Sequence, residues 1–253
     1  MNIQFPVTVD ILGHAILIHP ILEWIGIFVG MRLYGYLKRN RTTSLSTIQG
    51  LSVILGALMG ALFGSKIIGT LENPNAFLHA DLPLLYFWTS NTIVGGLAFG
   101  LVGVEAAKKI SGYKESTGDL MVYPLIVAMC IGRIGCFLTG IGEQTYGLPT
   151  TSIFGMHLGD EYLRHPVALY EIVFLIMLGI GINGFRKKYT YPSGVLFQIF
   201  MLCYFTFRFV LDFIKPKINI LLEISTIQIT CLVVVIYYIF KLQNHQNFIH
   251  KNN

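Results

Sequence analysis

The sequence predicts an all-α integral membrane protein of about seven transmembrane helices, with the N-terminus outside and the C-terminus in the cytoplasm. Of its 253 residues, 54% are hydrophobic and only 12% are charged. A soluble domain averages about 25% charged residues, and a soluble core of this size could not bury so much apolar sequence. Apolar segments run from end to end of the chain. We therefore expect a single polytopic membrane domain over residues 1–253.

Seven segments have the length of a membrane-spanning helix, which needs about 20 mainly apolar residues. The glycine- and proline-rich connections between them are typical of loops, and the segments lack the alternation of β-barrel strands. The fifth segment is short. The predicted spans are 16–37, 48–70, 84–107, 120–141, 168–185, 194–214 and 223–241.

Lysine and arginine in the connecting segments predict the orientation, because cytoplasmic loops are enriched in both. One side carries only Arg164, in the 142–167 loop, and Lys215 and Lys217 in the sixth connection. This asymmetry places the N-terminus outside and explains the net charge of +5 without a nucleic-acid partner. The first fifteen residues have no lysine or arginine, so no removable signal peptide is expected. The eleven basic residues of the other side are Lys38, Arg39, Arg41, Lys108, Lys109, Lys114, Arg186, Lys187, Lys188, Lys241 and Lys251.

Arg133 is the residue that the fourth span has to accommodate. It stands in the apolar run LMVYPLIVAMCIGRIGCFLTG, which begins at Leu120. An arginine among lipid tails costs from about 3 to more than 10 kcal/mol, so Arg133 should face a polar cavity, a partner or an anionic ligand. Gly132 and Gly135 remove side-chain bulk beside it, which lets another helix or a lipid headgroup approach.

Other polar residues should lie at the same depth as Arg133. Arg133 is about 20 Å along the outward-running fourth span, and Arg208 is about 21 Å along the sixth. Asp212 follows Arg208 by four residues, so the two can pair on one helical face. We therefore expect outward-facing chemistry. Further polar residues near the outer ends of the spans are His19, Glu23, Lys66, Arg164, His165 and Glu171.

The outer loop, residues 142–167, is the longest polar connection, and long loops are often functional. It could close over an outward-facing pocket, or it could be an exposed connector. Arginine binds phosphate bidentately and stabilises a phosphate that leaves when an ester bond breaks. Two interpretations follow: the arginines hold the phosphate of an anionic lipid, or they neutralise carboxylates such as Glu143 and Asp212.

Metal, cofactor and nucleotide chemistry has no motif support in the sequence. There is no GxSxG, HExxH, GxxxxGK[ST] or GxGxxG, which argues against a serine hydrolase, a zincin or a nucleotide-driven pump. The cysteines do not form a disulfide framework or a metal-type CxxC pair. They are expected to be buried and inert, and they are Cys130, Cys136, Cys203 and Cys231.

Four ordered blocks between about residues 91 and 214 resemble the prolipoprotein diacylglyceryl transferase family. The family signature GR[IL]GNF[IL]NGE followed by YG is matched by GRIGCFLTGIGEQTYG, which starts at Gly132. The blocks RHPxxLYE and FRF[LV]x[ED]F recur at 164–171 and 207–213, and an HGGL block is echoed by VGGLAFG at 94–100. The resemblance implies the same seven-span, N-outside topology.

The resemblance implies a reaction that needs no metal or soluble cofactor. The sn-1,2-diacylglyceryl group of phosphatidylglycerol passes to the lipobox cysteine thiol of a preprolipoprotein, and glycerol 1-phosphate is released. The site would face the outer half of the bacterial inner membrane. By this match Arg133 holds the lipid phosphate, Arg208 lies at the leaving phosphate or the thiol, and Glu143 is the signature glutamate displaced by two residues. The residues matched to headgroup binding are Gly95, Gly96, Arg133, Cys136, Tyr146, Arg164, His165, Tyr170 and Glu171.

Three positions depart from the family pattern. The histidine before Gly-Gly is Val94, and the two signature asparagines are Cys136 and Thr139. If that histidine helps to deprotonate the thiol, its role is vacant, unnecessary, or moved to His19 or His165. Cys136 itself is not expected to be a nucleophile, because apolar neighbours keep a thiol protonated, although Arg133 weakens that objection.

Two other functions remain open. The changed positions favour a related membrane transferase with a different lipid donor or acceptor. A non-catalytic protein that binds or transports anionic lipid is the other alternative, although a transporter is expected to show inverted repeats or paired broken helices, and the sequence shows no such symmetry.

Overall fold

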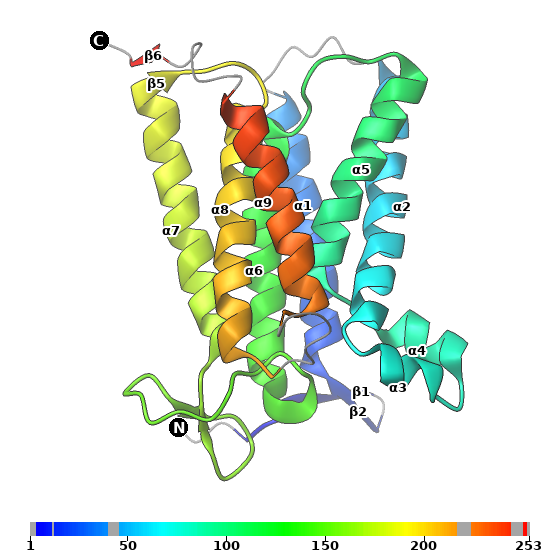
Figure 1. Cartoon of the computed structure of the whole chain (residues 1–253), viewed down its shortest axis with the longest axis vertical. Helices are drawn as coiled ribbons and strands as arrows, with labels where there is room; N and C mark the ends of the chain where they lie inside the picture. The colour runs from blue at the N-terminus through cyan, green and yellow to red at the C-terminus, as the bar shows by residue number, and fades with distance from the viewer. Residues whose placement is uncertain (1–3, 12, 40–45, 217–223, 244–249, 252–253) are drawn as a thin grey trace.

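The computed structural model describes residues 4–11, 13–39, 46–216, 224–243 and 250–251. Within these ranges the chain is mainly helical, and its long helices run side by side (Figure 1). They are α1 (Ile18–Arg39), α2 (Thr47–Leu71), α5 (Ile93–Ser111), α6 (Val122–Thr139), α7 (Val167–Lys188), α8 (Val195–Leu211) and α9 (Thr226–Gln243).

Five helical segments are long and apolar enough to cross a membrane. The other two long helices, α1 and α5, are not among them. The predicted helical membrane class is therefore supported, and each predicted span overlaps one long helix. The five segments are Thr47–Leu71, Asp119–Gly142, Val167–Lys188, Val195–Ile214 and Thr226–Gln243.

The predicted start of the third span is wrong. Residues from 84 belong to a separate short helix, α4 (Pro83–Thr89), and α5 begins only at Ile93. Ser90 and Thr92 have extended backbone conformations that interrupt the helix. A further short helix, α3 (Pro74–Leu78), precedes α4. The fifth span, predicted to be short, is 22 residues long because its basic last turn continues to Lys188.

The two ends of the helix assembly differ in charge. The last turns of α1, α5, α7 and α9 all carry lysine or arginine. These turns lie at the end where the C-terminus is found, whereas the N-terminal segment, α3, α4 and the outer loop lie at the opposite end (Figure 1). Among the basic residues that set the predicted orientation, Arg41 and Lys217 fall outside the described residues.

In the described part of the chain, the strands are short and lie in the segments outside the helices. β1 (Thr8–Ile11) and β2 (His14–Leu17) form an antiparallel hairpin before α1. Val7 N donates to Leu138 O at 2.9 Å, and the ring of Phe5 packs edge-on against Phe137. The N-terminal segment is thereby attached to the end of α6. The other pairs are β3 (Met156–His157) with β4 (Leu163–Arg164), and β5 (Tyr189–Thr190) with β6 (His250–Lys251).

Helices α2 and α5 approach through glycines. A Cβ added at Gly60 would lie 2.2 Å from Phe99 O, and one added at Gly103 would lie 2.0 Å from Gly56 O. Neither backbone could remain in place with a larger residue. Small residues allow helix backbones in membranes to pack this closely, so these glycines determine the α2–α5 contact.

Helices α1 and α6 also meet at glycines, and this contact positions the site. A Cβ at Gly135 would lie 2.7 Å from Cδ2 of His19, and one at Gly26 would lie 2.8 Å from Ala128 O. Next to Gly132, by contrast, no described atom lies within 4 Å of the added carbon. The prediction that glycine beside Arg133 admits another helix is confirmed for Gly135, which receives His19.

A carboxylate ties the start of α6 to the start of α8. Asp119, in the 3-10 turn η1 (Asp119–Met121), accepts hydrogen bonds from Gly194 N at 2.7 Å and from Phe197 N at 3.0 Å. These amides belong to the first turn of α8, whose N–H groups have no partner within the helix. Gly194 has a φ of +97°, a conformation that favours glycine. Residues 119 and 194 are therefore held together at the basic end.

Candidate active site

Glu171 is the centre of the buried polar cluster. Its Oε1 lies 2.9 Å from Nε of Arg133, and its Oε2 accepts a hydrogen bond from Nη1 of Arg208 at 3.2 Å. The Glu171 and Arg208 side chains are only 2% and 4% exposed. The two arginines, placed at one depth from helix length alone, thus meet at a single carboxylate from α7.

The cluster carries a surplus of positive charge. Two guanidinium groups, which stay protonated in proteins, share one carboxylate. Tyr204 of α8 donates its hydroxyl to Oε1 of Glu171 at 2.8 Å and adds no charge. Nε of Arg208 has no hydrogen-bond partner among the described residues. The cluster therefore has a free N–H donor on Arg208 and one unbalanced positive charge, and both can bind an anion.

The predicted pairing of Arg208 with Asp212 is wrong. Asp212 is buried, but its Oδ2 accepts a hydrogen bond from the hydroxyl of Ser225. It begins the 3-10 turn η3 (Asp212–Ile214), and Ser225 holds its carboxylate while Glu171 takes the guanidinium of Arg208. The arginines do meet a carboxylate, as the second interpretation expects, but this carboxylate is Glu171 and not Glu143 or Asp212.

Cys136 lies between Arg133 and His19. Nη1 of Arg133 donates to Sγ at 3.4 Å, and Nε2 of His19 lies 3.5 Å from the same sulfur. The expectation that the neighbours of Cys136 are mainly apolar is therefore wrong, and the expected influence of Arg133 is present. Its position one helical turn after Arg133 puts both on one face of α6, and α1 supplies the histidine.

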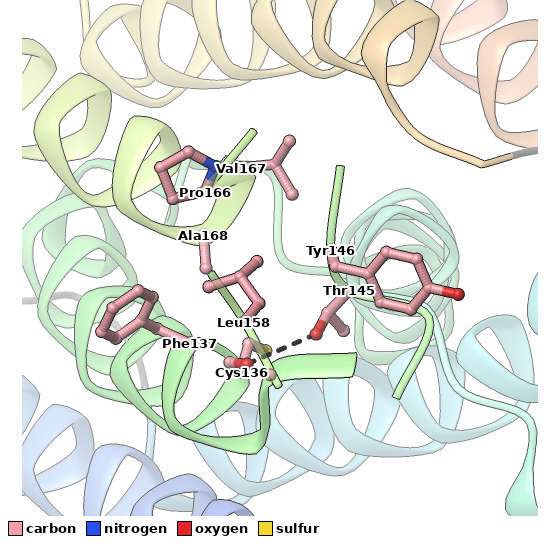
Figure 2. A pocket seen from close by; sticks show the side chains of 9 residues that line it. Cys136, Phe137, Thr145, Tyr146, Leu158, Pro166, Val167 and Ala168 are labelled. Atoms are coloured by element: carbon pink, nitrogen blue, oxygen red, sulfur yellow. Dashed lines mark hydrogen bonds between the residues drawn. The ribbon is translucent and has the colours of Figure 1, made fainter. Parts of the chain in front are cut away.

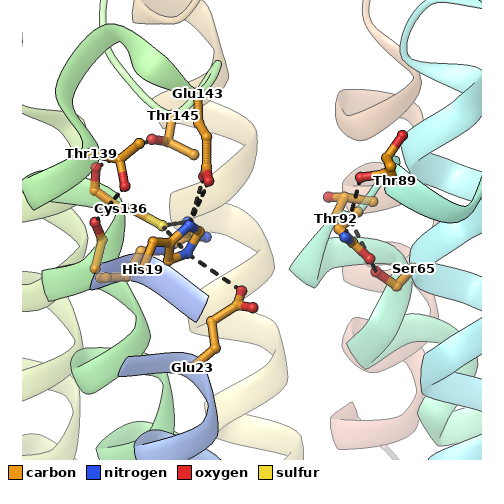
Figure 3. Close-up of polar contacts among 12 residues, drawn as sticks. His19, Glu23, Ser65, Thr89, Thr92, Cys136, Thr139, Glu143 and Thr145 are labelled. Atoms are coloured by element: carbon orange, nitrogen blue, oxygen red, sulfur yellow. Dashed lines mark hydrogen bonds and ion pairs between the residues drawn. The ribbon is translucent and has the colours of Figure 1, made fainter. Parts of the chain in front are cut away.

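His19 makes its shortest contact with Glu143. Nδ1 of the ring lies 2.7 Å from Oε2 and 2.8 Å from Oε1 of this carboxylate, which follows the end of α6. On its other side, Nε2 lies 3.4 Å from Oε1 of Glu23. Figure 3 shows the ring between the two carboxylates, with the sulfur of Cys136 beside it. The signature glutamate thus lies at the histidine rather than at the arginines.

The outer loop packs against the end of α6. Ile141 N donates to Leu158 O at 3.0 Å, and Leu158 is 3% exposed. Thr145 donates its hydroxyl to Cys136 O at 3.5 Å (Figure 2). A small cavity lies beneath the loop, lined by residues that include Cys136, Phe137, Tyr146, Leu158, Val167 and Ala168. The loop therefore covers the sulfur side of the site.

Arg164 holds the outer loop in shape. It donates to Oδ2 of Asp160 at 2.8 Å and to Gly147 O at 3.3 Å, and its guanidinium packs over the ring of Tyr146 at 4.9 Å. The adjacent guanidinium lowers the pKa of the Asp160 carboxyl below its usual value. Arg164 and Tyr146 thus contact each other, with their polar groups occupied within the loop.

The remaining predicted residues divide between the loop and the α2–α5 contact. Nδ1 of His165 lies 3.2 Å from the hydroxyl of Tyr170 at the start of α7. A Cβ at Gly95 would lie 2.2 Å from Gly64 O, and Gly96 also faces α2. Val94 is completely buried in the apolar core.

Lys66 lies in α2, apart from the arginines. Its ammonium group donates to Trp88 O and, at 2.7 Å, to Oδ1 of Asn91. It thereby stabilises the irregular segment between α4 and α5. Within the described ranges, no group of three or more His, Cys, Asp or Glu side chains is placed to hold a metal ion.

The comparisons with known proteins agree with the motif resemblance. The family described as prolipoprotein diacylglyceryl transferase matches residues 6–243. The chain belongs to this family. It is 29% identical over 232 residues to the phosphatidylglycerol–prolipoprotein diacylglyceryl transferase of Bordetella parapertussis, covering 82% of this chain and 83% of the relative.

Two further relatives carry the same name. The transferase of Ehrlichia ruminantium is 30% identical over 179 residues, which is 67% of this chain and 68% of the relative. That of Aliivibrio salmonicida is 29% identical over 213 residues, or 77% of this chain and 71% of the relative. Together with the five apolar helices, membership of this transferase family makes the chain a multi-pass membrane protein.

Proposed function

We propose that this chain transfers the sn-1,2-diacylglyceryl group of phosphatidylglycerol to the lipobox cysteine thiol of a preprolipoprotein. The thiolate attacks the terminal glycerol carbon of the diacylglyceryl group, a carbon–sulfur bond forms, and the carbon–oxygen bond to phosphate breaks. The electron pair of that bond leaves on the phosphate oxygen, giving glycerol 1-phosphate. Membership of the transferase family supports this reaction.

The observation that carries the proposal is the sharing of Glu171 by Arg133 and Arg208. One positive charge in this buried cluster has no carboxylate of its own. A phosphate diester carries one negative charge and gains a second as it leaves, so the cluster stabilises the transition state more than the bound lipid. Fixed guanidinium groups with little water around them are especially effective in this role.

The two arginines have different tasks in this proposal. Arg133 lies beside the open space at Gly132, and it holds the lipid phosphate. Arg208 is the more buried of the two and faces the oxygen that leaves. Glu171 holds the two guanidinium groups at the same depth along the helices. It is their counter-ion rather than a ligand of the headgroup.

The outer loop forms the wall of the proposed site that faces away from the basic end of the helices. Tyr146, Arg164, His165 and Tyr170 shape this wall, and Cys136 lies beneath it. Gly95 and Gly96 contribute through the packing of α2 on α5. We assign no direct contact with the headgroup to these two glycines.

We propose that the seven long helices all span the bacterial inner membrane as one domain, with the N-terminus outside. The basic last turns of α1, α5, α7 and α9 support this orientation, because they lie together at one end and cytoplasmic ends are enriched in lysine and arginine. The arginine cluster then lies in the outer half of the membrane.

The test is mass spectrometry of a lipobox peptide incubated with purified protein and phosphatidylglycerol. We expect a diacylglyceryl addition on the cysteine, and its loss in Arg133→Lys and Arg208→Lys. Lysine keeps the charge beside Glu171 but loses the planar fork that binds phosphate. Arg186→Ala, at the exposed basic end, is the control and should keep wild-type activity.

The changed positions Val94, Cys136 and Thr139 define the second arm of this test. If folded protein adds nothing from phosphatidylglycerol while an active relative does, the proposed donor or acceptor is wrong. A transferase that accepts another anionic lipid would then give a different mass addition in a screen of lipids. Lipid binding without any addition would identify a non-catalytic protein.

A further inference from the structure

We infer that Glu23 of α1 and Lys66 of α2 recognise the uncharged glycerol end of the lipid headgroup. Glu23 accepts hydrogen bonds from the glycerol hydroxyls and Lys66 donates to them, while the phosphate lies at the arginines. This inference rests on the proposed function, because it assigns the headgroup specificity of the same site. It is drawn from the depth of the two residues, their charges and the open space beside them.

Glu23, Lys66 and Arg133 lie at one depth on three different helices. Glu23 is five residues after the first residue of α1, Lys66 is five before the last residue of α2, and Arg133 is six before the last residue of α6. At 1.5 Å per residue, each is about 8–9 Å from the outer end of its helix. A headgroup whose phosphate meets Arg133 therefore has its glycerol at the level of the other two residues.

The space between α1 and α6 is open beside Glu23. The two helices touch on either side of this place, where Gly135 meets His19 and where Gly26 meets the backbone of α6. Because α1 and α6 are antiparallel, Gly132 lies opposite the turn of α1 that contains Glu23. A Cβ added at Gly132 would have no described atom within 4 Å. A headgroup held by the neighbouring arginine can therefore extend into this space.

Glu23 has a carboxylate oxygen available for a ligand. Its Oε1 lies 3.4 Å from Nε2 of His19, and its Oε2 has no protein partner among the described residues. Glu143 takes the opposite nitrogen of the ring (Figure 3). With a carboxylate at each nitrogen, His19 is held as a cation and fixes the position of Glu23. Because an ionised carboxylate only accepts hydrogen bonds, the exposed Glu23 is suited to bind hydroxyl groups.

Lys66 is buried and has one donor left. Its side chain lies in a residue only 7% exposed, and its ammonium group donates to Trp88 O and, at 2.7 Å, to Oδ1 of Asn91. An ammonium group has three N–H donors, so one remains for a ligand. In the described part of the chain no carboxylate forms an ion pair with Lys66. The charges of Lys66 and Glu23 nevertheless attract each other across the space between the helices.

Two opposite charges that face one space select an uncharged polyol. A carboxylate alone would favour a headgroup that ends in an ammonium group, and an ammonium group alone would favour one that ends in a carboxylate. When both are present, a singly charged end is attracted by one group and repelled by the other. A hydroxyl both donates and accepts hydrogen bonds, so a glycerol with two hydroxyls can bind Glu23 and Lys66 together.

The first measurement is the affinity of the purified protein for four soluble phosphate monoesters, determined by calorimetry. They are glycerol 1-phosphate, ethyl phosphate, phosphoethanolamine and phosphoglycolate, which share the phosphate and end in a hydroxylated, apolar, cationic or anionic group. We expect the wild type to bind glycerol 1-phosphate at least about tenfold more tightly than the other three. The reason is that these three cannot form both charge-assisted hydrogen bonds.

Removal of one charge should change this preference in a defined direction. Glu23→Ala should abolish the preference for glycerol 1-phosphate over ethyl phosphate and strengthen phosphoglycolate relative to the other three, because Lys66 is then unopposed. Lys66→Met should instead strengthen phosphoethanolamine, because Glu23 is then unopposed. Glu161→Ala, which removes an exposed carboxylate of the outer loop, is the matched control and should keep the wild-type order.

Equal affinity of the wild type for glycerol 1-phosphate and ethyl phosphate would overturn the inference. An unchanged preference in folded Glu23→Ala would do the same, and this variant should fold because the side chain is 59% exposed. Lys66 also holds the segment between α4 and α5, so Lys66→Gln, which can still donate to Trp88 O, is measured beside Lys66→Met. Wild-type discrimination against phosphoethanolamine in either folded variant would show that Lys66 takes no part.

A second measurement compares two lipids as donors in the transfer reaction. Phosphatidylethanol has the same charge as phosphatidylglycerol but lacks the two hydroxyls. The wild type should have a higher kcat/KM for phosphatidylglycerol, and Glu23→Ala should lower kcat/KM for this lipid more than for phosphatidylethanol. A purely structural role of Glu23 would lower both values by the same factor and would contradict the assignment.

The inference and the proposed function fail in different ways. If the wild type prefers glycerol 1-phosphate through Glu23 but transfers nothing, the proposed reaction is wrong and the recognition of glycerol stands. If transfer occurs while all four monoesters bind equally, the inference is wrong and the reaction stands. Absence of binding of every monoester would overturn the inference as well.

Discussion

The carboxylate of Glu171 in α7 lies 2.9 Å from Nε of Arg133 in α6, with both side chains largely buried. The same carboxylate also binds Arg208 of α8. Three helices therefore meet at one anion in the apolar part of the molecule. Because burial weakens the screening of charge, the cluster depends on all three groups being ionised.

Removal of this carboxylate charge should destabilise the fold strongly. Glu171→Gln leaves two buried guanidinium groups facing each other without a counter-ion, and breaking a buried pair in this way costs about 3–5 kcal/mol. We expect a clearly lower melting temperature in detergent. Glu161→Gln, an exposed change in the outer loop, should leave it unaltered; equal melting temperatures would show that the cluster does not stabilise the fold.

Substitution by alanine should be harmful at Gly135 and tolerated at Gly132, the two glycines beside Arg133. In Gly135→Ala the new Cβ would lie 2.7 Å from Cδ2 and 3.1 Å from Cα of His19, whereas Gly132→Ala meets open space. We expect Gly135→Ala to displace His19 and lower transfer by at least about tenfold, since small misplacements are costly in catalysis. The measurement is the transfer rate at equal amounts of folded protein. A wild-type rate in Gly135→Ala would contradict the α1–α6 contact.

The outer loop should loosen in acid through Asp160. Arg164 lowers the pKa of Asp160, so the stabilisation is fully present above about pH 4, the ordinary pKa of aspartate. It is lost as the pH falls through the lower value in the folded state. Hydrogen exchange of residues 156–164, corrected for intrinsic rates, should increase over that range. Asp160→Asn should exchange faster at neutral pH and lose this pH dependence.

A larger residue at Gly60 should separate α2 from α5. Its Cβ would lie 2.2 Å from the backbone oxygen of Phe99, which no rotamer change relieves. Gly60→Val should therefore destabilise the protein by about 1–3 kcal/mol or more. Gly181→Val in α7, where no described atom lies within 4 Å of the new Cβ, is the matched control. Thermal melting of both variants in the same detergent measures the difference.

The sequence predicted the depth of the two arginines along their helices, but it did not predict that Glu171 is their shared partner. Counting 1.5 Å per residue placed Arg133 and Arg208 together along the helices. It gave no information on how each helix is rotated or which helices are neighbours. Helical spacing does put Asp212 one turn after Arg208, but Ser225 takes the Asp212 carboxylate and Glu171 takes the Arg208 guanidinium. The role of Glu171 as a shared counter-ion therefore required the fold.

Other features depend on contacts between distant segments. His19 and Glu143 are 124 residues apart, and no local pattern joins them. The third span was misplaced because residues 84–88 are apolar, yet Leu84, Leu85 and Trp88 of α4 are exposed. An exposed short helix with tyrosine and tryptophan is typical of a membrane interface, and this signal was present in the sequence.

The hydrogen bond from Gly194 N to Asp119 fixes the starts of α6 and α8 relative to each other. Arg133 is fourteen residues beyond Asp119, and Arg208 is fourteen residues beyond Gly194. Because both arginines are the same number of residues from this hydrogen bond, their guanidinium groups reach the same carboxylate. A single residue inserted in either helix would turn its arginine by about 100° and leave the other one alone with Glu171. The spacing from the basic end is thus as much a part of the site as the arginines themselves.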